Sequence, residues 1–184
     1  MTKRSLMDMY DDMDGQALMM ALDYLKDDTA VFPLADLLEL LEETSDLELT
    51  VFIVQLLMYR IKEIDDDLML VYFPKSSDKV KQQIITIFAT LAESKYMQFL
   101  LDEYFKNPYF RPAIRQQAFK DKMNLFMNLV RYYEDLPLTS DGVLVAQQIL
   151  RMIPRDVVIK TGNVFTGTRL MDVYYAMPPE DRAN

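Results

Sequence analysis

The sequence predicts an all-α fold, and more specifically an α-solenoid of about five two-helix repeats. Apolar residues recur at intervals of three and four over most of the 184 residues, as at Leu34, Leu37, Leu38 and Leu41. The four glycines and most of the eight prolines stand between these periodic segments. Similar helix starts recur about every 31 residues, which is the mark of a repeat architecture.

Each of the five units is expected to contain two helices. The first helices are expected at residues 4–12, 33–43, 66–74, 95–106 and 122–135. The second helices are expected at residues 15–27, 46–63, 78–93, 110–120 and 141–153. Residues typical of helix N-caps precede four of the second helices: Asp14, Ser45 or Asp46, Ser77 or Asp78, and Ser140 or Asp141. The remaining second helix begins near Asn107–Tyr109.

The second helices align on a short pattern with apolar residues at its first and fifth positions. The pattern begins at Leu18, Leu49, Val80, Ile114 and Val145, so the starts are 31, 31, 34 and 31 residues apart. Three of the five patterns carry Gln-Gln in the same register. One helical hairpin cannot bury its apolar face alone, whereas stacked hairpins can, which favours a solenoid. An ordinary bundle of regularly sized helices is the alternative.

These two-helix units resemble HEAT repeats. The resemblance is carried by Val80-Lys-Gln-Gln-Ile84 and Ile114-Arg-Gln-Gln-Ala118 on the second helices, and it covers residues 1–153. The units are most similar to the short HEAT-like repeats first described in phycobilisome bilin lyases. The resemblance implies a protein-interaction scaffold whose second helices line a concave face, with bilin lyases and some DNA glycosylases as enzymatic exceptions. In the family, a basic residue follows the first apolar residue of this pattern. Lys81 and Arg115 supply it in two units, but Met19, Thr50 and Ala146 stand at the same position in the other three. The family's ladder of Asp–Arg contacts between repeats is therefore expected to be partial.

The residues from 154 to 184 differ in composition from the repeat domain of residues 1–153. The β-branched run Val157, Val158 and Ile159 predicts a short strand, and Gly162-Asn163 predicts a turn. Residues from Leu170 to Met177 are expected to form a last short helix. Because a solenoid needs its terminal core covered, we expect this segment to be a C-terminal cap. A loop that binds a partner or ligand is the alternative.

Composition excludes several classes of function. The chain has no Cys and no His, which rules out disulfides, thiol nucleophiles and Ser-His-Asp machinery from this chain alone. With 20 basic and 29 acidic side chains the net charge is −9, which argues against general binding to nucleic acid or anionic membranes. The chain shows neither a signal peptide nor a run of the roughly 20 apolar residues that span a bilayer. We therefore expect a soluble cytoplasmic protein without a metal or another cofactor.

Three motifs fall short of the sites they suggest. Residues 12–15 resemble the middle of a calcium loop, but the ligands that should precede and follow them are missing. Residues 162–169 have the glycine spacing of a phosphate loop, but Thr168 stands where the lysine should be. The acidic cluster of Glu63 with residues 65–67 has the oxygen ligands that a hard cation takes. It is expected between two helices, however, where aspartate caps a helix N-terminus.

Aromatic doublets and polar residues of the second helices mark the expected binding surface. Neighbours on a helix point about 100° apart, so both members of a doublet rarely face one core, and some tyrosines should be at least half exposed. The doublets are Tyr72-Phe73, Tyr104-Phe105, Tyr109-Phe110, Tyr132-Tyr133 and Tyr174-Tyr175. The candidate partner-binding residues are Lys81, Gln82, Arg115, Gln116, Gln147, Tyr104, Tyr109 and Tyr132.

The expected function is therefore a non-catalytic module that binds another protein, and the acidic charge suits a basic partner. One alternative is an enzyme, or a lyase-type helper that binds a small cofactor in the concave groove. The other is nucleic-acid binding through a local basic face. That face would consist of Lys79, Lys81, Arg111, Arg115, Lys120 and Lys122.

Overall fold

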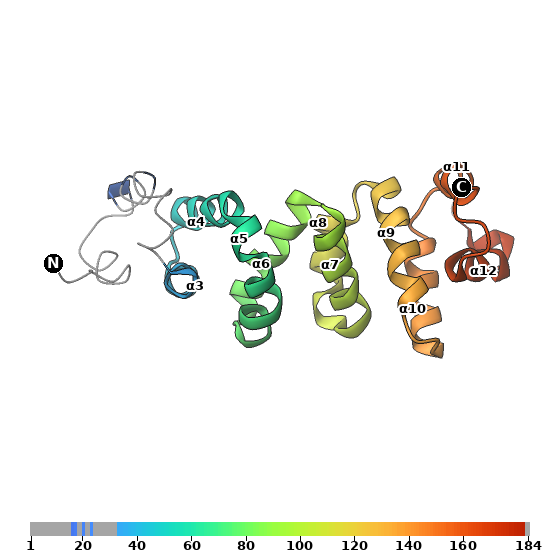
Figure 1. The fold of residues 1–184 in the computed structure, drawn as a ribbon, viewed down its shortest axis with the longest axis horizontal. Coiled ribbons are helices and arrows are strands. Elements are labelled where there is room, and N and C mark those ends of the chain that lie inside the picture. Colours follow the sequence, from blue (N-terminus) through green and yellow to red (C-terminus); the bar gives the residue numbers. More distant parts are fainter. Residues whose placement is uncertain (1–15, 18–19, 21–22, 24–32, 183–184) are drawn as a thin grey trace. The chain divides into compact units, whose positions relative to one another are not determined.

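The computed structural model describes residues 16–17, 20, 23 and 33–182 (Figure 1). The predicted helix at 4–12 and most of the one at 15–27 lie outside these residues. In the part described, the regular structure is entirely helical, which confirms the all-α prediction. The chain divides into two compact units, Met1–Ile87 and Phe88–Asn184. No helix among the described residues is both long and apolar enough to cross a membrane.

Between residues 33 and 87, the first unit contains three α-helices, two short helical turns and the start of a fourth α-helix. They are α3 (Leu34–Glu43), α4 (Leu47–Tyr59), α5 (Ile61–Asp67), the π-helical turn η1 (Leu68–Tyr72), the 3₁₀ turn η2 (Phe73–Lys75) and α6 (Asp78–Leu91). Its core is aliphatic, and Leu37 on α3 and Ile53 on α4 are fully buried in it. The leucine spacing that predicted the helix at 33–43 therefore faces this core, as expected.

Polar side chains stabilise both helix ends that meet at the corner between α3 and α4. The Asp46 carboxylate caps α4 by accepting the N–H groups of Glu48 (2.9 Å) and Leu49 (3.3 Å). The Lys79 ammonium on α6 donates to the carbonyls of Glu42 (3.0 Å) and Thr44 (2.6 Å). These carbonyls lie at and just beyond the C-terminus of α3, where they have no partner within the helix. A basic side chain of α6 thus satisfies the end of α3.

The boundary between the predicted helices at 46–63 and 66–74 is wrong. The structure breaks the helix at Arg60 and continues through residues 61–67 into η1 and η2. The physical reason is burial, because Ile61, Ile64 and Leu68 must all face the core and only a continuous helix places them there. Asp65 is buried within α5 instead of capping a helix, and its carboxylate accepts the N–H of the next residue.

The second unit contains six further α-helices. They are α7 (Ser94–Lys106), α8 (Arg111–Ala118), α9 (Lys122–Asp135), α10 (Ser140–Leu150), α11 (Arg155–Gly162) and α12 (Arg169–Ala176), with the 3₁₀ turns η3 (Pro108–Phe110) and η4 (Pro179–Asp181). Helix α9 is central, since it packs against α7 on one side and against α11 and α12 on the other (Figure 1). The predictions for 95–106, 122–135 and the last helix agree with α7, α9 and α12 to within one residue.

A buried polar network ties α9 to the corner between α6 and α7. The Asn128 side-chain amide donates to the Asn124 carbonyl at 2.9 Å, and its oxygen accepts the Ser94 hydroxyl at 3.0 Å. The Asn124 amide in turn donates to the Ala92 carbonyl at 3.1 Å. Asn128 is only 5% exposed, so these hydrogen bonds replace water for its polar atoms. The network fixes the register of α9 against the α6–α7 corner.

Ala92 ends α6 with a positive φ of 53°, a conformation that disfavours side chains with a Cβ. We expect Ala92→Gly to raise the free energy of unfolding by up to about 1 kcal/mol, because relief of the strain outweighs the entropy of an added glycine. Ala89→Gly, inside the same helix, should lower it by about 1 kcal/mol. Chemical denaturation of both variants checks this, and equal losses would contradict the prediction.

The strand predicted at Val157–Ile159 is wrong, because these residues lie in α11. Pro154 precedes the helix, Asp156 lies in its first turn and Lys160 in its last, and all three favour a helix at this place. Val158 is buried against the rest of the unit. Helix-end signals and burial thus override the β-propensity of the run. The predicted cap of residues 154–184 contributes α11 and α12, which both pack on α9.

Several hydrogen bonds join residues that are separated by similar distances in the sequence. Side-chain hydrogen bonds join residues 30 to 37 positions apart at Lys79–Thr44, Arg131–Ser94, Tyr132–Asp102 and Arg169–Leu136. The side chains that cap α4, α6, η3 and α10 are Asp46, Ser77, Asn107 and Thr139. These caps are 31, 30 and 32 residues apart.

Candidate functional site

The second unit contains a surface recess with a volume of about 570 Å³. It lies between the end of α7, the first turn of α8 and the start of α10, and several of its residues are exposed, so it opens to solvent. Its apolar lining residues are Phe105, Pro108, Leu136, Pro137, Leu144 and Val145. Its polar ones include Lys106, Arg111, Asp141 and Gln148. A recess of this size and mixed character accommodates side chains of a protein segment.

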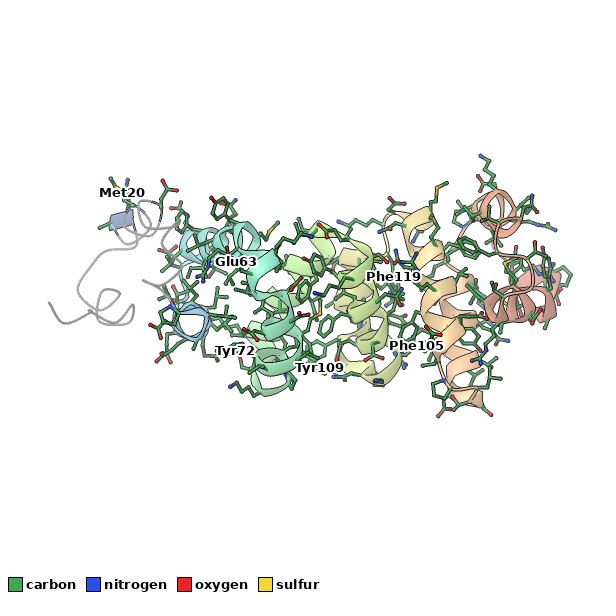
Figure 2. All side chains as sticks on the ribbon, viewed as in Figure 1. Met20, Glu63, Tyr72, Phe105, Tyr109 and Phe119 are labelled. Carbon is green, nitrogen blue, oxygen red and sulfur yellow. The ribbon has the colours of Figure 1, made fainter. Side chains whose placement is uncertain are left out.

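Arg111 builds one wall of the recess. Its Nε donates to the Tyr104 carbonyl at 2.7 Å and its Nη2 to the Phe105 carbonyl at 3.2 Å. The guanidinium also lies 5.6 Å from the centre of the Tyr104 ring, within the range of a cation–π contact. Arg111 thereby satisfies the C-terminal carbonyls of α7 and fixes the position of Phe105, which Figure 2 labels together with Tyr109.

A second, smaller recess of about 320 Å³ shares Lys106, Leu136 and Pro137 with the first. At its centre the Asp102 carboxylate accepts the Tyr132 hydroxyl and the Lys106 ammonium, each at 2.9 Å. Burial and the neighbouring Asp102 carboxylate together raise the pKa of the Tyr132 phenol far above its usual value. Tyr132 is therefore a neutral hydrogen-bond donor, and a phenol with so high a pKa is a poor general acid or base near neutral pH.

The eight candidate residues fall into different environments. Gln82, Arg115 and Gln116 are exposed, and Lys81, Gln147 and Tyr132 are partly buried. Lys81 and Gln82 belong to the first unit and the other six to the second. Tyr104 is 2% exposed and packs on the Phe119 ring at 5.0 Å, so it is a core residue. Tyr109, in contrast, is 62% exposed and stands on η3 beside the recess.

The aromatic doublets each divide between core and surface, as predicted. The buried members are Phe73, Tyr104, Phe110, Tyr133 and Tyr174. Their neighbours Tyr72, Phe105 and Tyr132 are partly exposed, and Tyr109 and Tyr175 are more than 60% exposed. The sequence could place one member of each doublet at the surface. It could not predict which member lies at the surface, because that depends on how each helix is rotated about its axis relative to the core.

The residues that line the recess were largely missed as site residues. Phe105 was expected only as half of a doublet, Arg111 only as part of a basic face, and Gln148 only as half of a Gln-Gln pair. Leu144 carried no signal, because an exposed leucine in the first turns of α10 looks like an ordinary helical residue. The recess depends on the meeting of three helix ends, which periodicity does not reveal.

Most basic side chains of the expected basic face act within the protein. Lys79 and Arg111 bind the carbonyls at the ends of α3 and α7, and the Lys122 ammonium donates to the Phe119 carbonyl at 2.6 Å. The Lys81 ammonium lies 5.4 Å from the centre of the Phe73 ring. These contacts compete with phosphate binding, so the structure offers little support for the nucleic-acid alternative.

Neither the acidic nor the glycine-bearing motif forms the site it resembles. Among the described residues, no group of three or more carboxylates is arranged to hold a metal ion. The calcium-like stretch at 12–15 lies outside the described residues. In the stretch 162–169, Gly162 lies close to α12, since an added Cβ would be 2.9 Å from the Met171 Cε, and Gly167 has a φ of +83°. These two glycines therefore serve packing and a turn.

Adjacent tyrosines on α9 provide a matched test of the Asp102 contact. Tyr132→Phe should lower the free energy of unfolding by about 1–2 kcal/mol, because it removes a hydrogen bond to a carboxylate. Tyr133→Phe should leave it unchanged or raise it by up to about 1 kcal/mol, because the buried Tyr133 hydroxyl has no hydrogen-bond partner in the described structure. Urea denaturation measures both, and a larger loss in Tyr133→Phe would contradict the assignment.

Stability should fall at alkaline pH. Burial raises the pKa of Tyr133 as well as that of Tyr132, with Arg169 opposing the shift at Tyr133. The unfolded chain releases these phenolic protons near pH 10, whereas the folded chain retains them, so the contribution of the two tyrosines to stability is constant below about pH 9 and decreases above about pH 10. Denaturation midpoints between about pH 8 and pH 11 should show this fall. Tyr132→Phe should make the fall shallower, and an unchanged slope would contradict the prediction.

In comparison with known proteins, no family model, no curated protein and no solved structure matches this chain. The resemblance to HEAT-like repeats stays a prediction from the sequence.

Proposed function

We propose that this protein is a non-catalytic module that binds another protein through the recess between α7, α8 and α10. The observation that carries the proposal is the lining of the recess, where Phe105 and Leu144 lie beside the charged groups of Arg111 and Asp141. Protein interfaces combine apolar and aromatic anchors with arginine in this way. Tyr109 and Leu138, which are 62% and 69% exposed, extend the apolar surface on the neighbouring η3 and on the loop before α10.

We propose further that the module is an α-solenoid of HEAT-like repeats. The spacing of 30 to 32 residues between the four helix caps supports this architecture. Hydrogen bonds between residues about one repeat apart support it too, because each repeat of a solenoid contacts mainly its neighbours. In such an architecture the recess lies where one repeat meets the next.

The enzyme alternative is less well supported by the chemistry of the two recesses. In the smaller recess, burial and Asp102 raise the pKa of the Tyr132 phenol, which donates a hydrogen bond to Asp102. That arrangement holds a neutral phenol in place and does not activate a nucleophile or base at neutral pH. The Lys106 ammonium binds the same carboxylate, so it is paired within the wall of the recess.

The recess can be tested by site-specific photo-crosslinking in the native cell. A photoreactive amino acid in place of Leu144 should cross-link one defined protein, whereas the same group at Ile159 on α11 should not. Both positions are more than half exposed, which makes Ile159 a matched control. Leu144→Glu should abolish co-purification of the same protein. Retention of the partner by Leu144→Glu, with its loss on Arg115→Glu and Gln116→Glu, would move the site to the outer face of α8.

A further inference from the structure

The π-helical turn η1 turns an apolar pair outward on the first unit. The N–H of Phe73 donates to the Leu68 carbonyl, a five-residue step that places both side chains in the core. Two of the four residues between them face solvent, since Leu70 and Val71 are 76% and 47% exposed. Two adjoining exposed aliphatic side chains on a rare type of turn form a small unpartnered apolar face.

Exposed carboxylates of α5 precede this apolar face in the chain. Glu63 and Asp67 are four residues apart on α5, so they lie on one face of that helix, and both are exposed. The exposed Leu70 and Val71 follow in η1, directly after α5. Figure 2 labels Glu63 toward the start of the segment and Tyr72 at its end. We name the surface of Glu63, Asp67, Leu70 and Val71 the α5–η1 stripe.

The charge of the chain is concentrated in the unit that carries the stripe. Residues 1–87 contain 18 acidic and eight basic side chains, whereas residues 88–184 contain 11 and 12. Of the former, 12 acidic and five basic side chains belong to the described residues 23 and 33–87. The field around the stripe is therefore strongly negative and favours a cationic partner.

We propose that the α5–η1 stripe docks a basic amphipathic helix of a partner protein. The apolar face of that helix would cover Leu70 and Val71, and its lysines or arginines would meet Glu63 and Asp67. A second copy of this chain is a poor occupant, because a twofold contact between two stripes would bring like charges together. The stripe lies in the first unit and does not include the recess, so this proposal stands or falls independently of the proposed function.

The test uses the full chain, labelled with ¹⁵N, and two synthetic helical peptides of about 18 residues. One peptide places leucines on one face and lysines on the other, and the control peptide has glutamate in place of every lysine. We expect the Lys–Leu peptide to bind at least about tenfold more tightly than the Glu–Leu peptide by calorimetry. Its binding should shift amide signals mainly in residues 63–75, and raising sodium chloride from about 50 to about 500 mM should weaken it several-fold.

Variants of the stripe separate specific docking from general attraction to an acidic protein. Leu70→Ser with Val71→Ser should weaken binding of the Lys–Leu peptide about tenfold, and Glu63→Gln with Asp67→Asn should weaken it and reduce its salt dependence. Ile159→Ser with Val164→Ser, two exposed apolar positions of the second unit, should leave affinity unchanged. All of these positions are exposed, so the variants should fold.

Four results would overturn the proposal. They are failure of the Lys–Leu peptide to bind, equal affinity for the Leu70→Ser, Val71→Ser variant, signal shifts that centre outside residues 63–75, and tight binding of the Glu–Leu peptide. Binding of the chain to zwitterionic phosphatidylcholine vesicles, lost in the same double variant, would also overturn it, because it would make the stripe a lipid-binding surface.

Discussion

Replacing Arg111 by alanine is expected to lower the free energy of unfolding by about 2–3 kcal/mol. The substitution removes two charge-assisted hydrogen bonds to the Tyr104 and Phe105 carbonyls and the cation–π contact with the Tyr104 ring. The carbonyls at the end of α7 would then lack their partner. Because Phe105 lines the recess, the same variant should also weaken the proposed partner contact. Urea denaturation measures the first effect and crosslinking at Leu144 the second.

Arg115 offers the matched control on the same helix. It is exposed on α8, and Arg115→Ala should change stability by no more than about 0.5 kcal/mol. Arg111→Lys should recover only part of the loss, since an ammonium cannot form the two-pronged contact of a guanidinium. If Arg111→Ala proved as stable as Arg115→Ala, the carbonyls at the end of α7 would have to be satisfied by water. That result would contradict the proposed role of Arg111 in shaping the recess.

Asn128→Leu is expected to lower the free energy of unfolding by about 2–4 kcal/mol. Leucine has the same branching and the same number of side-chain heavy atoms as asparagine, but it is somewhat larger and can make none of its side-chain hydrogen bonds. The substitution leaves the Ser94 hydroxyl and the Asn124 carbonyl without the partner they have now, in a site where Asn128 is 5% exposed. Loss of the network should also loosen the α6–α7 corner, because Asn124 reaches the Ala92 carbonyl. Hydrogen exchange at residues 88–97 would detect this opening.

The exposed Asn163, after the end of α11, provides the control for the same exchange of side chains. Asn163→Leu should change stability by about 0.5 kcal/mol or less. A stability of Asn128→Leu equal to that of Asn163→Leu would mean that apolar packing at this position compensates for the lost hydrogen bonds. The network would then serve the specificity of packing without contributing to stability.

The sequence predicted the fold well wherever a helix follows its own periodicity. The apolar spacing of α3 and α9 and the caps at Asp46 and Ser77 lie where they were expected. It was wrong where burial and local propensity disagree. At residues 61–75 the need to bury Leu68 and Phe73 produces a π-helical turn, and at Val157–Ile159 helix-end signals overrule β-branched residues.

The candidate site was harder to predict than the fold. The sequence marked Arg111 as a basic residue and Phe105 as half of an aromatic doublet. It did not show that the Arg111 guanidinium binds the backbone carbonyls seven and six residues before it. The acidic charge of the whole chain suggested a basic partner. Its concentration in residues 1–87 became meaningful only once the structure gave the boundary between the two units. Periodicity and motifs in the sequence do not reveal which helix ends lie close together in the folded protein.

The separation of 30 to 37 residues between hydrogen-bonded partners has a consequence for the kinetics of folding. Contacts that close short loops form quickly, and folding rates rise as the sequence separation of native contacts falls. A contact such as Tyr132–Asp102 can form as soon as Tyr132 has emerged from the ribosome, because its partner lies only 30 residues earlier in the chain. We therefore expect this chain to fold progressively during translation, with each newly made helix pair adding to the one before it.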